Sequence, residues 1–375
     1  MATKAPPLRR GWTTGTCATA AAKAAYAGLL TGAFPDPVEV TLPRGGGRPA
    51  FALATTELKK ASATAGVVKD AGDDPDLTHG ALILATVRRA LPGSGVSFRA
   101  GEGVGTVTRA GLPVPPGEPA INPVPRQMIR DAIAEVATAY GNAGDIEVEI
   151  AIPGGEALAA KTMNGRLGII GGLSILGTTG IVIPYSCSSW IQAIRSGIDV
   201  ARAAGLTHVA GSTGAESERA VQSMYGLPEI ALIDMGDFVG GMLKYLRNHP
   251  VPCVTIAGGV GKMTKLAQGL LDLHSKRGAV DLAALAKLAE RAGSSHDLAA
   301  YILTANTAAE AFAHAEAEGI ALGDEVARAA RKTANEVVAG KDIDVEVVLF
   351  DREGRFAGRA PFAATHAAPP RKRRR

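Results

Sequence analysis

The chain has 375 residues, of which 46% are hydrophobic and 20% charged, so it can bury the cores of two domains. Its net charge is +4, but residues 371–375 are all basic, so the rest of the chain has a net charge of 4 − 5 = −1. The excess positive charge therefore lies in a C-terminal tail that we expect to be disordered. A basic tail without a structured basic face argues against a specific nucleic-acid partner. The three cysteines are too few and too scattered for a disulfide framework or a zinc site, which favours a reducing cytoplasm. The N-terminus shows no signal-peptide pattern, and no apolar run reaches about 18 residues, so we expect no membrane span.

The first predicted element is an Ala-rich helix over residues 18–30 that stops at Gly32. A polar segment, residues 12–17, precedes it. Thr14 or Thr16 can cap this helix and leave its first amides free for an anion. On these residues alone, a plain helix cap is the favoured interpretation.

The segment 69–79 gathers one lysine, four aspartates and one histidine. Charges this dense are costly to hold together unless they bind a ligand, a cation or one another. Carboxylates could bind a metal here, although the spacing is not that of an EF-hand, and a solvated acidic turn is the open alternative. The catalytic residues are unknown at this stage, and the candidates in this segment are Asp70, Asp73, Asp74 and His79.

The rest of the first half reads as an α+β domain over residues 1–186. A Gly-Gly-Gly turn joins strands at 38–42 and 51–58 into a hairpin, and further strands follow at 81–90, 97–108 and 146–152, with a helix at 126–140. The glycine-rich segment 164–186 predicts either a backbone-lined cradle or a packed connector. We favour the cradle because Thr178-Thr179-Gly180 repeats the Thr-Thr-Gly of residues 13–15.

From residue 187 onward, helices and strands alternate. The helices are expected at 189–204, 216–225, 238–248, 281–293, 296–319 and 324–340, with one more opened by residues 258–262 and running toward residue 271. The strands are expected at 207–210, 230–233, 251–257 and 345–350. Single helices between strands imply a parallel sheet with right-handed crossovers. We therefore expect a Rossmann-like α/β domain with a helical extension over residues 187–365, followed by the basic tail, residues 366–375.

Ligands bind at the carboxyl ends of the strands in such a sheet. A loop of small residues after the first strand lets a ligand approach the backbone, and an acidic residue about 20 positions on can accept hydrogen bonds from ribose hydroxyls. The spacing suits both a dinucleotide and S-adenosylmethionine, and an ordinary tight turn is the alternative. The candidate cofactor-binding residues are Gly211, Ser212, Thr213, Gly214, Asp234, Gly258 and Gly259.

Four segments together resemble the family of cobalt-precorrin-5B C1-methyltransferases, the CbiD family of anaerobic cobalamin biosynthesis. These are residues 8–18, 68–80, 164–186 and 258–265, and the resemblance covers nearly the whole chain before the basic tail. It implies methyl transfer from S-adenosylmethionine to C1 of the macrocycle, giving cobalt-precorrin-6A and S-adenosylhomocysteine. Cobalt would arrive with the substrate, so the chain would need no metal ligands of its own.

A tetrapyrrole fringed with carboxylates needs cations at the rim of its site. The resemblance implies substrate binding by residues of the first domain: Arg9, Arg10, Thr13, Thr14, Thr16, Lys69, Arg166, Thr178 and Thr179. The macrocycle would lie beneath residues 164–180 and 13–16. The expected partner is this small molecule, and a homo-oligomer is left open.

Two alternatives remain at the level of the sequence. An NAD(P)-dependent reductase would use the same glycine loop and aspartate. A non-catalytic tetrapyrrole-binding protein would use the basic tail as a docking arm. Binding of both cofactors and a methyl-transfer assay separate the three functions.

Overall fold

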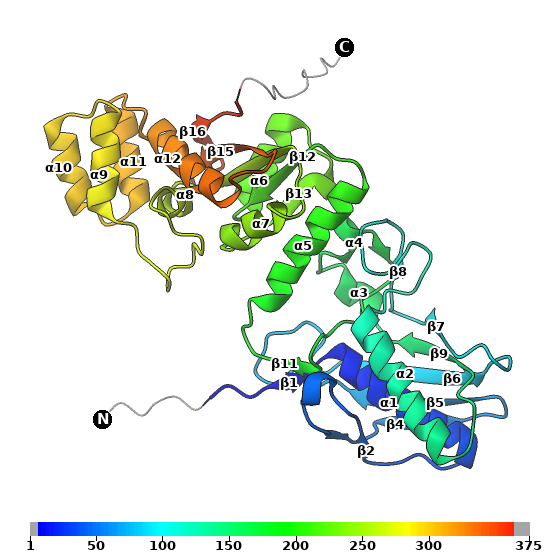
Figure 1. Cartoon of the computed structure of the whole chain (residues 1–375). Helices are drawn as coiled ribbons and strands as arrows, with labels where there is room; N and C mark the ends of the chain where they lie inside the picture. Colours follow the sequence, from blue (N-terminus) through cyan, green and yellow to red (C-terminus); the bar gives the residue numbers. More distant parts are fainter. Residues whose placement is uncertain (1–6, 364–375) are drawn as a thin grey trace, which may run out of the picture. The chain divides into compact units, whose positions relative to one another are not determined.

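The structure is a computed structural model that describes residues 7–363 (Figure 1). The expected tail, residues 366–375, lies outside the described residues. The chain divides into two compact units between Cys187 and Ser188, here called unit 1 and unit 2. Each unit is described by itself.

Unit 1 is built on a five-stranded sheet. Neighbouring strands are antiparallel, except for the last pair, which is parallel. The sheet order is β4 (Thr55–Leu58), β5 (Ser62–Val68), β6 (Leu82–Arg89), β9 (Ile146–Ala151) and β7 (Val96–Ala100).

Two helices form the second layer of unit 1, α1 (Thr14–Thr31) and α2 (Pro123–Ala139). Helix α1 packs on β5 and β6, and its alanines are fully buried, because small side chains let the helix lie close to the sheet. It ends at Gly32, which is in the left-handed region with φ 81°, as the sequence predicted. It begins at Thr14, earlier than expected, so part of the polar segment 12–17 belongs to its first turn.

Short elements complete unit 1. The pair β2–β3 is the expected hairpin, whereas residues 55–58 join the large sheet instead. Residues 153–186 contain only short helices and strands, and one of these strands pairs with the segment before α1. The elements are β1 (Gly11–Trp12) with β11 (Ile181–Val182), β2 (Val38–Glu39) with β3 (Ala50–Phe51), β8 (Thr106–Val107) with β10 (Ile169–Ile170), η1 (Pro43–Gly45), α3 (Gly155–Ala159) and α4 (Asn164–Leu167).

Unit 2 contains a second five-stranded sheet. Its first four strands are parallel, as predicted, and the last, which was not predicted, is antiparallel. The order is β13 (Leu232–Asp234), β12 (His208–Ser212), β14 (Cys253–Gly259), β15 (Asp344–Phe350) and β16 (Phe356–Ala360). In chain order this is 2-1-3-4-5, so the direction of progress along the sheet reverses between β12 and β14.

Helices cover both faces of this sheet. Helix α6 packs on one face, around Val221, and helices α5, α8 and α12 pack on the opposite face, around Ile256. The predicted single helix over 296–319 is two helices, because Thr307 accepts a hydrogen bond from the Glu310 amide and starts a new one. The helices are α5 (Ser188–Ala203), α6 (Ala215–Tyr225), η2 (Glu229–Ala231), α7 (Val239–Leu246), α8 (Val260–Ala267), α9 (Leu282–Arg291), α10 (His296–Thr304), α11 (Ala308–Ala317) and α12 (Leu322–Val337).

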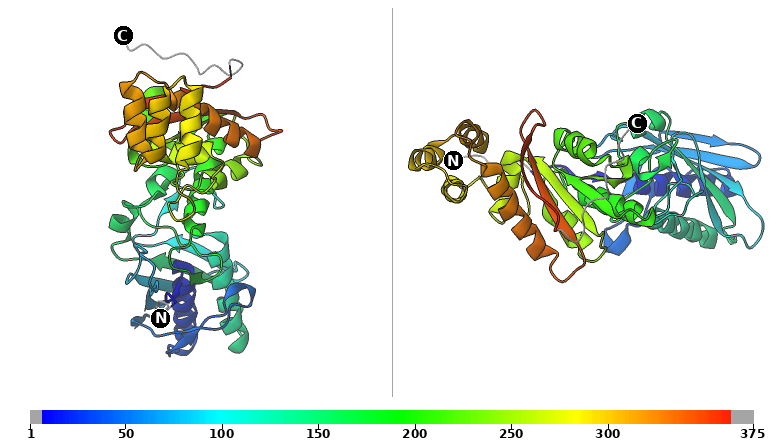
Figure 2. Two further views of the ribbon diagram at one scale, coloured as in Figure 1. Left: turned by 90° about the vertical axis from the view of Figure 1, so that its left-hand side faces the viewer. Right: turned by 90° about the horizontal axis from the view of Figure 1, so that it is seen from above.

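Helix α12 and strand β16 touch through their backbones. A Cβ atom on Gly323 would overlap the carbonyl group of Ala357, and one on Gly358 would lie 2.6 Å from the Cα of Gly323. The helical extension, α9 to α11, forms a separate group of helices beside α12 (Figure 2, right).

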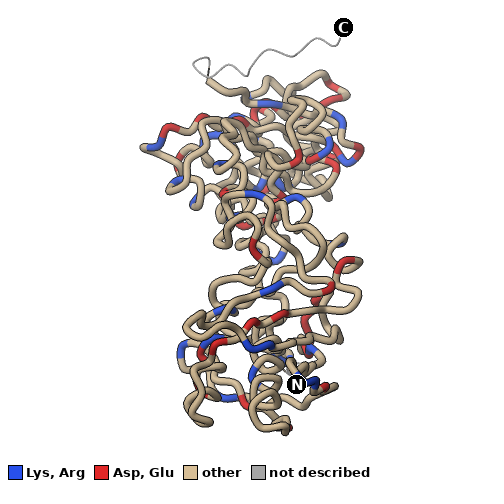
Figure 3. Tube along the Cα trace, turned by 90° about the vertical axis from the view of Figure 1, so that its right-hand side faces the viewer, with Lys and Arg blue, Asp and Glu red and all other residues tan. Residues whose placement is uncertain are grey.

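Basic and acidic residues are interspersed along both units (Figure 3). Within residues 7–363, no helix combines the length and the hydropathy that a membrane span requires.

Candidate functional site

The start of α1 is closed by the chain itself. Thr13 is the N-cap, and its hydroxyl accepts a hydrogen bond from the Thr16 amide at 3.3 Å. The Gly15 amide donates to the carbonyl of Leu176 at 3.1 Å. The expectation that Thr14 or Thr16 caps this helix and leaves its amides free for an anion is therefore wrong.

Residues 176–180 lie over this helix start as a strap. The Thr16 hydroxyl is buried and donates to the Gly180 carbonyl at 2.8 Å, and the Thr13 amide donates to the same carbonyl at 3.0 Å. Gly177 has a φ of 135°, and a Cβ there would lie 2.5 Å from the Cβ of Thr13. Thr16 therefore has no surface for a substrate, which corrects its assignment as a substrate-binding residue.

Of the other four threonines of the predicted substrate site, two are buried and two are exposed to solvent. Thr13 and Thr14 are buried in the first turn of α1 or just before it. Thr178 and Thr179 are exposed on the strap, where the Thr179 hydroxyl donates to the Ile181 carbonyl at 3.2 Å. The repeated Thr-Thr-Gly therefore marks two segments that pack on each other.

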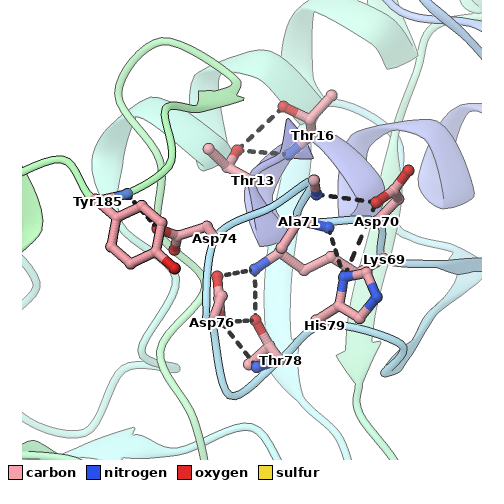
Figure 4. Close-up of polar contacts among 11 residues, drawn as sticks. Thr13, Thr16, Lys69, Asp70, Ala71, Asp74, Asp76, Thr78, His79 and Tyr185 are labelled. Atoms are coloured by element: carbon pink, nitrogen blue, oxygen red, sulfur yellow. Dashed lines mark hydrogen bonds and ion pairs between the residues drawn. The ribbon is translucent and has the colours of Figure 1, made fainter. Parts of the chain in front are cut away.

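The acidic segment is bonded to its surroundings through most of its side chains (Figure 4). Asp70 pairs with the Arg9 guanidinium through both oxygens, and Asp73 accepts from the Arg9 amide at 2.6 Å. The Arg9 bonds, together with one from the Gly72 amide, hold the pKa of the Asp70 carboxyl below its usual value. Asp70 and Asp73 are therefore held by Arg9, from outside the segment 69–79.

Asp74 holds the backbone of Tyr185. Its Oδ1 accepts a hydrogen bond from the Tyr185 amide at 2.8 Å (Figure 4). Tyr185 has a φ of 56°, an uncommon conformation for a residue with a bulky side chain, and its ring is 68% exposed. Sequence reasoning did not select Tyr185, although it lies in the quoted segment 164–186.

Lys69 lies inside the unit and not at a rim, so that part of the prediction is wrong. The residue is 2% exposed, and its ammonium is bonded to Asp76 and to the Thr78 hydroxyl. Burial alone would raise the pKa of Asp76, but the charge and hydrogen bond of Lys69, with bonds from Thr78, lower it below its usual value. Asp76 and Thr78 were not among the predicted site residues.

The bonds of His79 fix its tautomer. Its Nδ1 accepts a hydrogen bond from the Ala71 amide at 3.1 Å, so a neutral ring carries its proton on Nε2. Half of its side chain is exposed. In this state His79 offers a donor to a ligand and not a base.

The acidic segment is therefore a bonded scaffold. It presents Arg9 and Tyr185, and the pKa values of Asp70 and Asp76 are lowered, which does not suit either of these two for the role of a general base. Within residues 7–363, no group of three or more His, Cys, Asp or Glu side chains is arranged to hold a metal ion.

Two further predicted cations lie elsewhere in unit 1. Arg10 is exposed, and its side chain pairs with none of the described residues. Arg166 is half-buried in α4, and its carbonyl accepts from the Arg109 guanidinium at 2.9 Å.

In unit 2, the predicted cofactor loop starts later than expected. Gly211 is part of β12, and a Cβ there would lie 2.6 Å from the Cε of Met242. Gly258 is part of β14, and a Cβ there would lie 2.7 Å from the Cε of Met263. These glycines make room for core side chains, so their assignment to cofactor binding is wrong.

The open positions are one or two residues further on. Gly214 precedes α6 and Gly259 precedes α8, and a Cβ on either would meet no atom within 4 Å. No side chain of the described residues caps the first turn of α6. The Ser212 hydroxyl at the end of β12 is buried, with no hydrogen-bond partner within residues 7–363. A polar ligand can form hydrogen bonds with accessible backbone groups and with a hydroxyl that has no other partner.

Lys262 ties this edge together. Its ammonium donates to the Thr213 carbonyl at 2.9 Å and pairs with Asp237 at 3.1 Å. Asp234 ends β13, and its carbonyl accepts from the indole Nε1 of Trp190 at 3.0 Å. Sequence reasoning passed over Lys262, although it lies in the quoted segment 258–265, and Trp190, which stands in the first turn of a predicted helix.

Comparisons with known proteins identify the family of the chain. A sequence model of the family CbiD matches residues 1–184, and a model described as the CbiD C-terminal domain matches residues 272–361. A protein from Bradyrhizobium sp. strain BTAi1 is 62% identical, over 98% of this chain and 97% of its own length. One from Agrobacterium fabrum is 63% identical, over 99% of this chain and 97% of its own. One from Halorhodospira halophila is 61% identical, over 95% of each.

All three relatives carry the name cobalt-precorrin-5B C(1)-methyltransferase. The crystal structure of a cobalamin biosynthesis protein, CbiD, from Archaeoglobus fulgidus is 28% identical, covers 72% of this chain and 83% of its own, and superposes with a TM-score of 0.40. The chain belongs to the CbiD family.

Proposed function

We propose that the protein methylates C1 of cobalt-precorrin-5B, with S-adenosylmethionine as the methyl donor, to give cobalt-precorrin-6A and S-adenosylhomocysteine. The observation that carries this function is identity of about 60% along nearly the whole chain to relatives named for that reaction. The reaction belongs to the anaerobic route to cobalamin, and the cobalt is part of the substrate.

Unit 2 supplies the cofactor side in this proposal. Its strand order, 2-1-3-4-5, is one of the doubly wound orders that bind ligands where the order reverses, so we assign it a Rossmann-like role. Gly214, Gly259 and the Ser212 hydroxyl lie at the carboxyl ends of β12 and β14, beside that reversal. Asp234 is assigned to the ribose. S-adenosylmethionine brings an already activated methyl group, so the chain has to align and shield it.

Unit 1 supplies the substrate side. Arg9 and Arg10 are exposed cations suited to the carboxylates of the macrocycle, and the acidic segment orients Arg9. Thr178 and Thr179 are exposed on the strap, which is bonded to the start of α1. The domain ranges 1–186 and 187–365 and these residue roles are part of the proposal.

The reductase alternative is not favoured. The first turn of α6 carries two acidic residues, Glu216, which pairs with Arg219, and Glu218, and negative charge at a helix start opposes a pyrophosphate there. S-adenosylmethionine has no phosphate and carries a sulfonium cation, so the same charges are compatible with it.

Incubation of the full-length protein with S-adenosylmethionine labelled with ¹³C in its methyl group and with cobalt-precorrin-5B tests the function. The expected result is one label on C1 of the macrocycle by NMR, with one S-adenosylhomocysteine formed per label. Macrocycle that binds but returns unlabelled would favour a non-catalytic tetrapyrrole-binding protein. Oxidation of NADPH in a parallel reaction would favour a reductase.

A further inference from the structure

The side chain of Trp190 lies at the carboxyl edge of the sheet in unit 2. Its indole N–H donates to the carbonyl of Asp234, the last residue of β13. Asp234 is also the residue assigned to the ribose. The indole is thus attached to the strand end where the cofactor's sugar is expected.

The ring is supported from within the unit and remains open to solvent. A Cβ on Gly236 would lie 3.1 Å from the Cζ2 of Trp190, so this glycine lets the backbone approach the ring. The Phe238 ring lies at a centroid distance of 6.3 Å, tilted by 55°. Trp190 nevertheless stays 45% exposed, in a chain with only 4% aromatic residues.

The turn that supports the ring is bonded to the end of β12. The amides of Met235 and Gly236 both donate to the Ser212 carbonyl, at 3.1 and 3.2 Å. Ser212 also carries the buried hydroxyl without a partner among residues 7–363. One set of hydrogen bonds therefore fixes the indole, the acidic residue at the end of β13 and the unsatisfied hydroxyl relative to one another.

We infer that Trp190 forms an adenine-binding subsite, in which the purine ring of the cofactor stacks on the exposed indole. The inference rests on the proposed function, since it concerns the same cofactor. Aromatic side chains bind nucleobases through their π faces, and tryptophan offers the largest face. Core packing explains the contacts with Gly236 and Phe238, and the hydrogen bond to the Asp234 carbonyl fixes the exposed part of the ring at the strand end.

The sequence makes a direct optical test possible, because the chain has only two tryptophans, Trp12 and Trp190. In a Trp12→Phe variant of the full-length protein, Trp190 is the only indole. Titration of this variant with S-adenosylhomocysteine or adenosine is expected to quench or shift its emission. Methionine, which has no purine, is expected to leave the emission unchanged.

Affinity provides the second readout. By calorimetry, Trp190→Ala is expected to weaken S-adenosylhomocysteine binding about tenfold or more, and Trp190→Phe by less than about threefold, because phenylalanine retains a stacking face. Phe356→Ala is the matched control, since Phe356 is a 57% exposed aromatic of the same unit on β16. It is expected to keep the affinity of the unmodified protein.

Outcomes for the subsite and for the function are distinguishable. Methyl transfer with unchanged Trp190 emission on ligand binding, and equal affinity in Trp190→Ala, would overturn the subsite alone. Absence of both S-adenosylhomocysteine binding and methyl transfer in the unmodified protein would overturn the subsite together with the function. If Trp190→Ala fails to fold by circular dichroism, the emission titration of Trp12→Phe decides the question by itself.

Discussion

Each unit contains a helix that starts beside a threonine and a glycine, and the two starts differ. At α1, Thr13 caps the first turn and the Leu176 carbonyl accepts from the Gly15 amide. At α6, the residue before the helix is Gly214, and no described side chain caps the first turn. The first start is closed by the chain, and the second is open to a ligand.

The difference lies in a segment far away in the sequence. The strap that closes α1 is about 160 residues further along the chain, as the bond from Thr16 to Gly180 spans 164 positions. A local pattern of threonine and glycine predicts a helix start, but not whether a distant carbonyl uses its amides. Substitutions in the closed region should therefore change stability, and those at the open region should change ligand binding.

The largest effect is expected for Lys69→Met in the closed unit. The substitution leaves the Asp76 carboxylate without its buried partner, and breaking such a pair costs about 3–5 kcal/mol. Chemical denaturation followed by circular dichroism measures the loss. Lys59→Met is the matched control, because Lys59 pairs with Glu57 at 2.9 Å on the surface and should cost less than about 1 kcal/mol. Equal losses in both variants would contradict burial as the cause.

Gly177→Ala should destabilise the closed helix start by about 3 kcal/mol. The new methyl group would clash with Thr13 and would also require a left-handed backbone. Gly171→Ala separates the two causes, because Gly171 has a φ of 86° with no atom within 4 Å of the added Cβ. It should lose only about 1 kcal/mol. A lower melting temperature for Gly171→Ala than for Gly177→Ala would show that a steric clash with Thr13 is not the cause of the destabilisation.

In unit 2, stability should depend on pH through His208, which lies at the opposite end of β12 from Gly214. Burial lowers the pKa of His208 from 6.5 to about 4, and its Nε2 is bonded to the Thr255 hydroxyl at 2.8 Å. The unfolded chain takes up the proton first as the pH falls, so stability present above pH 6.5 is lost progressively and the loss approaches about 3 kcal/mol near pH 4.

His208→Gln should flatten that pH profile, and His274→Gln, at an exposed position, should not. Denaturant midpoints between pH 7 and pH 4 measure the slopes. Identical slopes for His208→Gln and the unmodified protein would show that another group is responsible.

The smallest effect on stability is expected at the open helix start. Gly214→Leu adds a side chain where no atom lies within 4 Å, on an extended backbone, so the free energy of unfolding should change by less than about 0.5 kcal/mol. Its affinity for S-adenosylhomocysteine should nevertheless fall about tenfold or more, since the side chain would occupy the ligand's approach to the backbone. Unchanged affinity by calorimetry would remove Gly214 from the cofactor site.

Local patterns predicted the elements well and the site less well. The alternation of helices and strands after residue 187 gave the parallel sheet, because amphipathic periodicity is a local property. The pairing of Arg9 with Asp70, 61 positions away, is not local, and neither is the burial of Lys69. Gly211 was misassigned because the sequence does not distinguish a glycine that leaves room for a ligand from one that leaves room for a core side chain, here that of Met242. Strand β16 was missed because it is short and follows a charged turn.

The contact between Gly323 and Gly358 has a consequence for variation within the family. Neither glycine lies in the predicted sites, yet each occupies the space that a side chain of the other would need. A larger residue at one position cannot be compensated by a smaller residue at the other, because no residue is smaller than glycine. Deep mutational scanning should therefore find that neither position tolerates any substitution, including alanine. Relatives in which α12 packs on β16 in this way should carry both glycines.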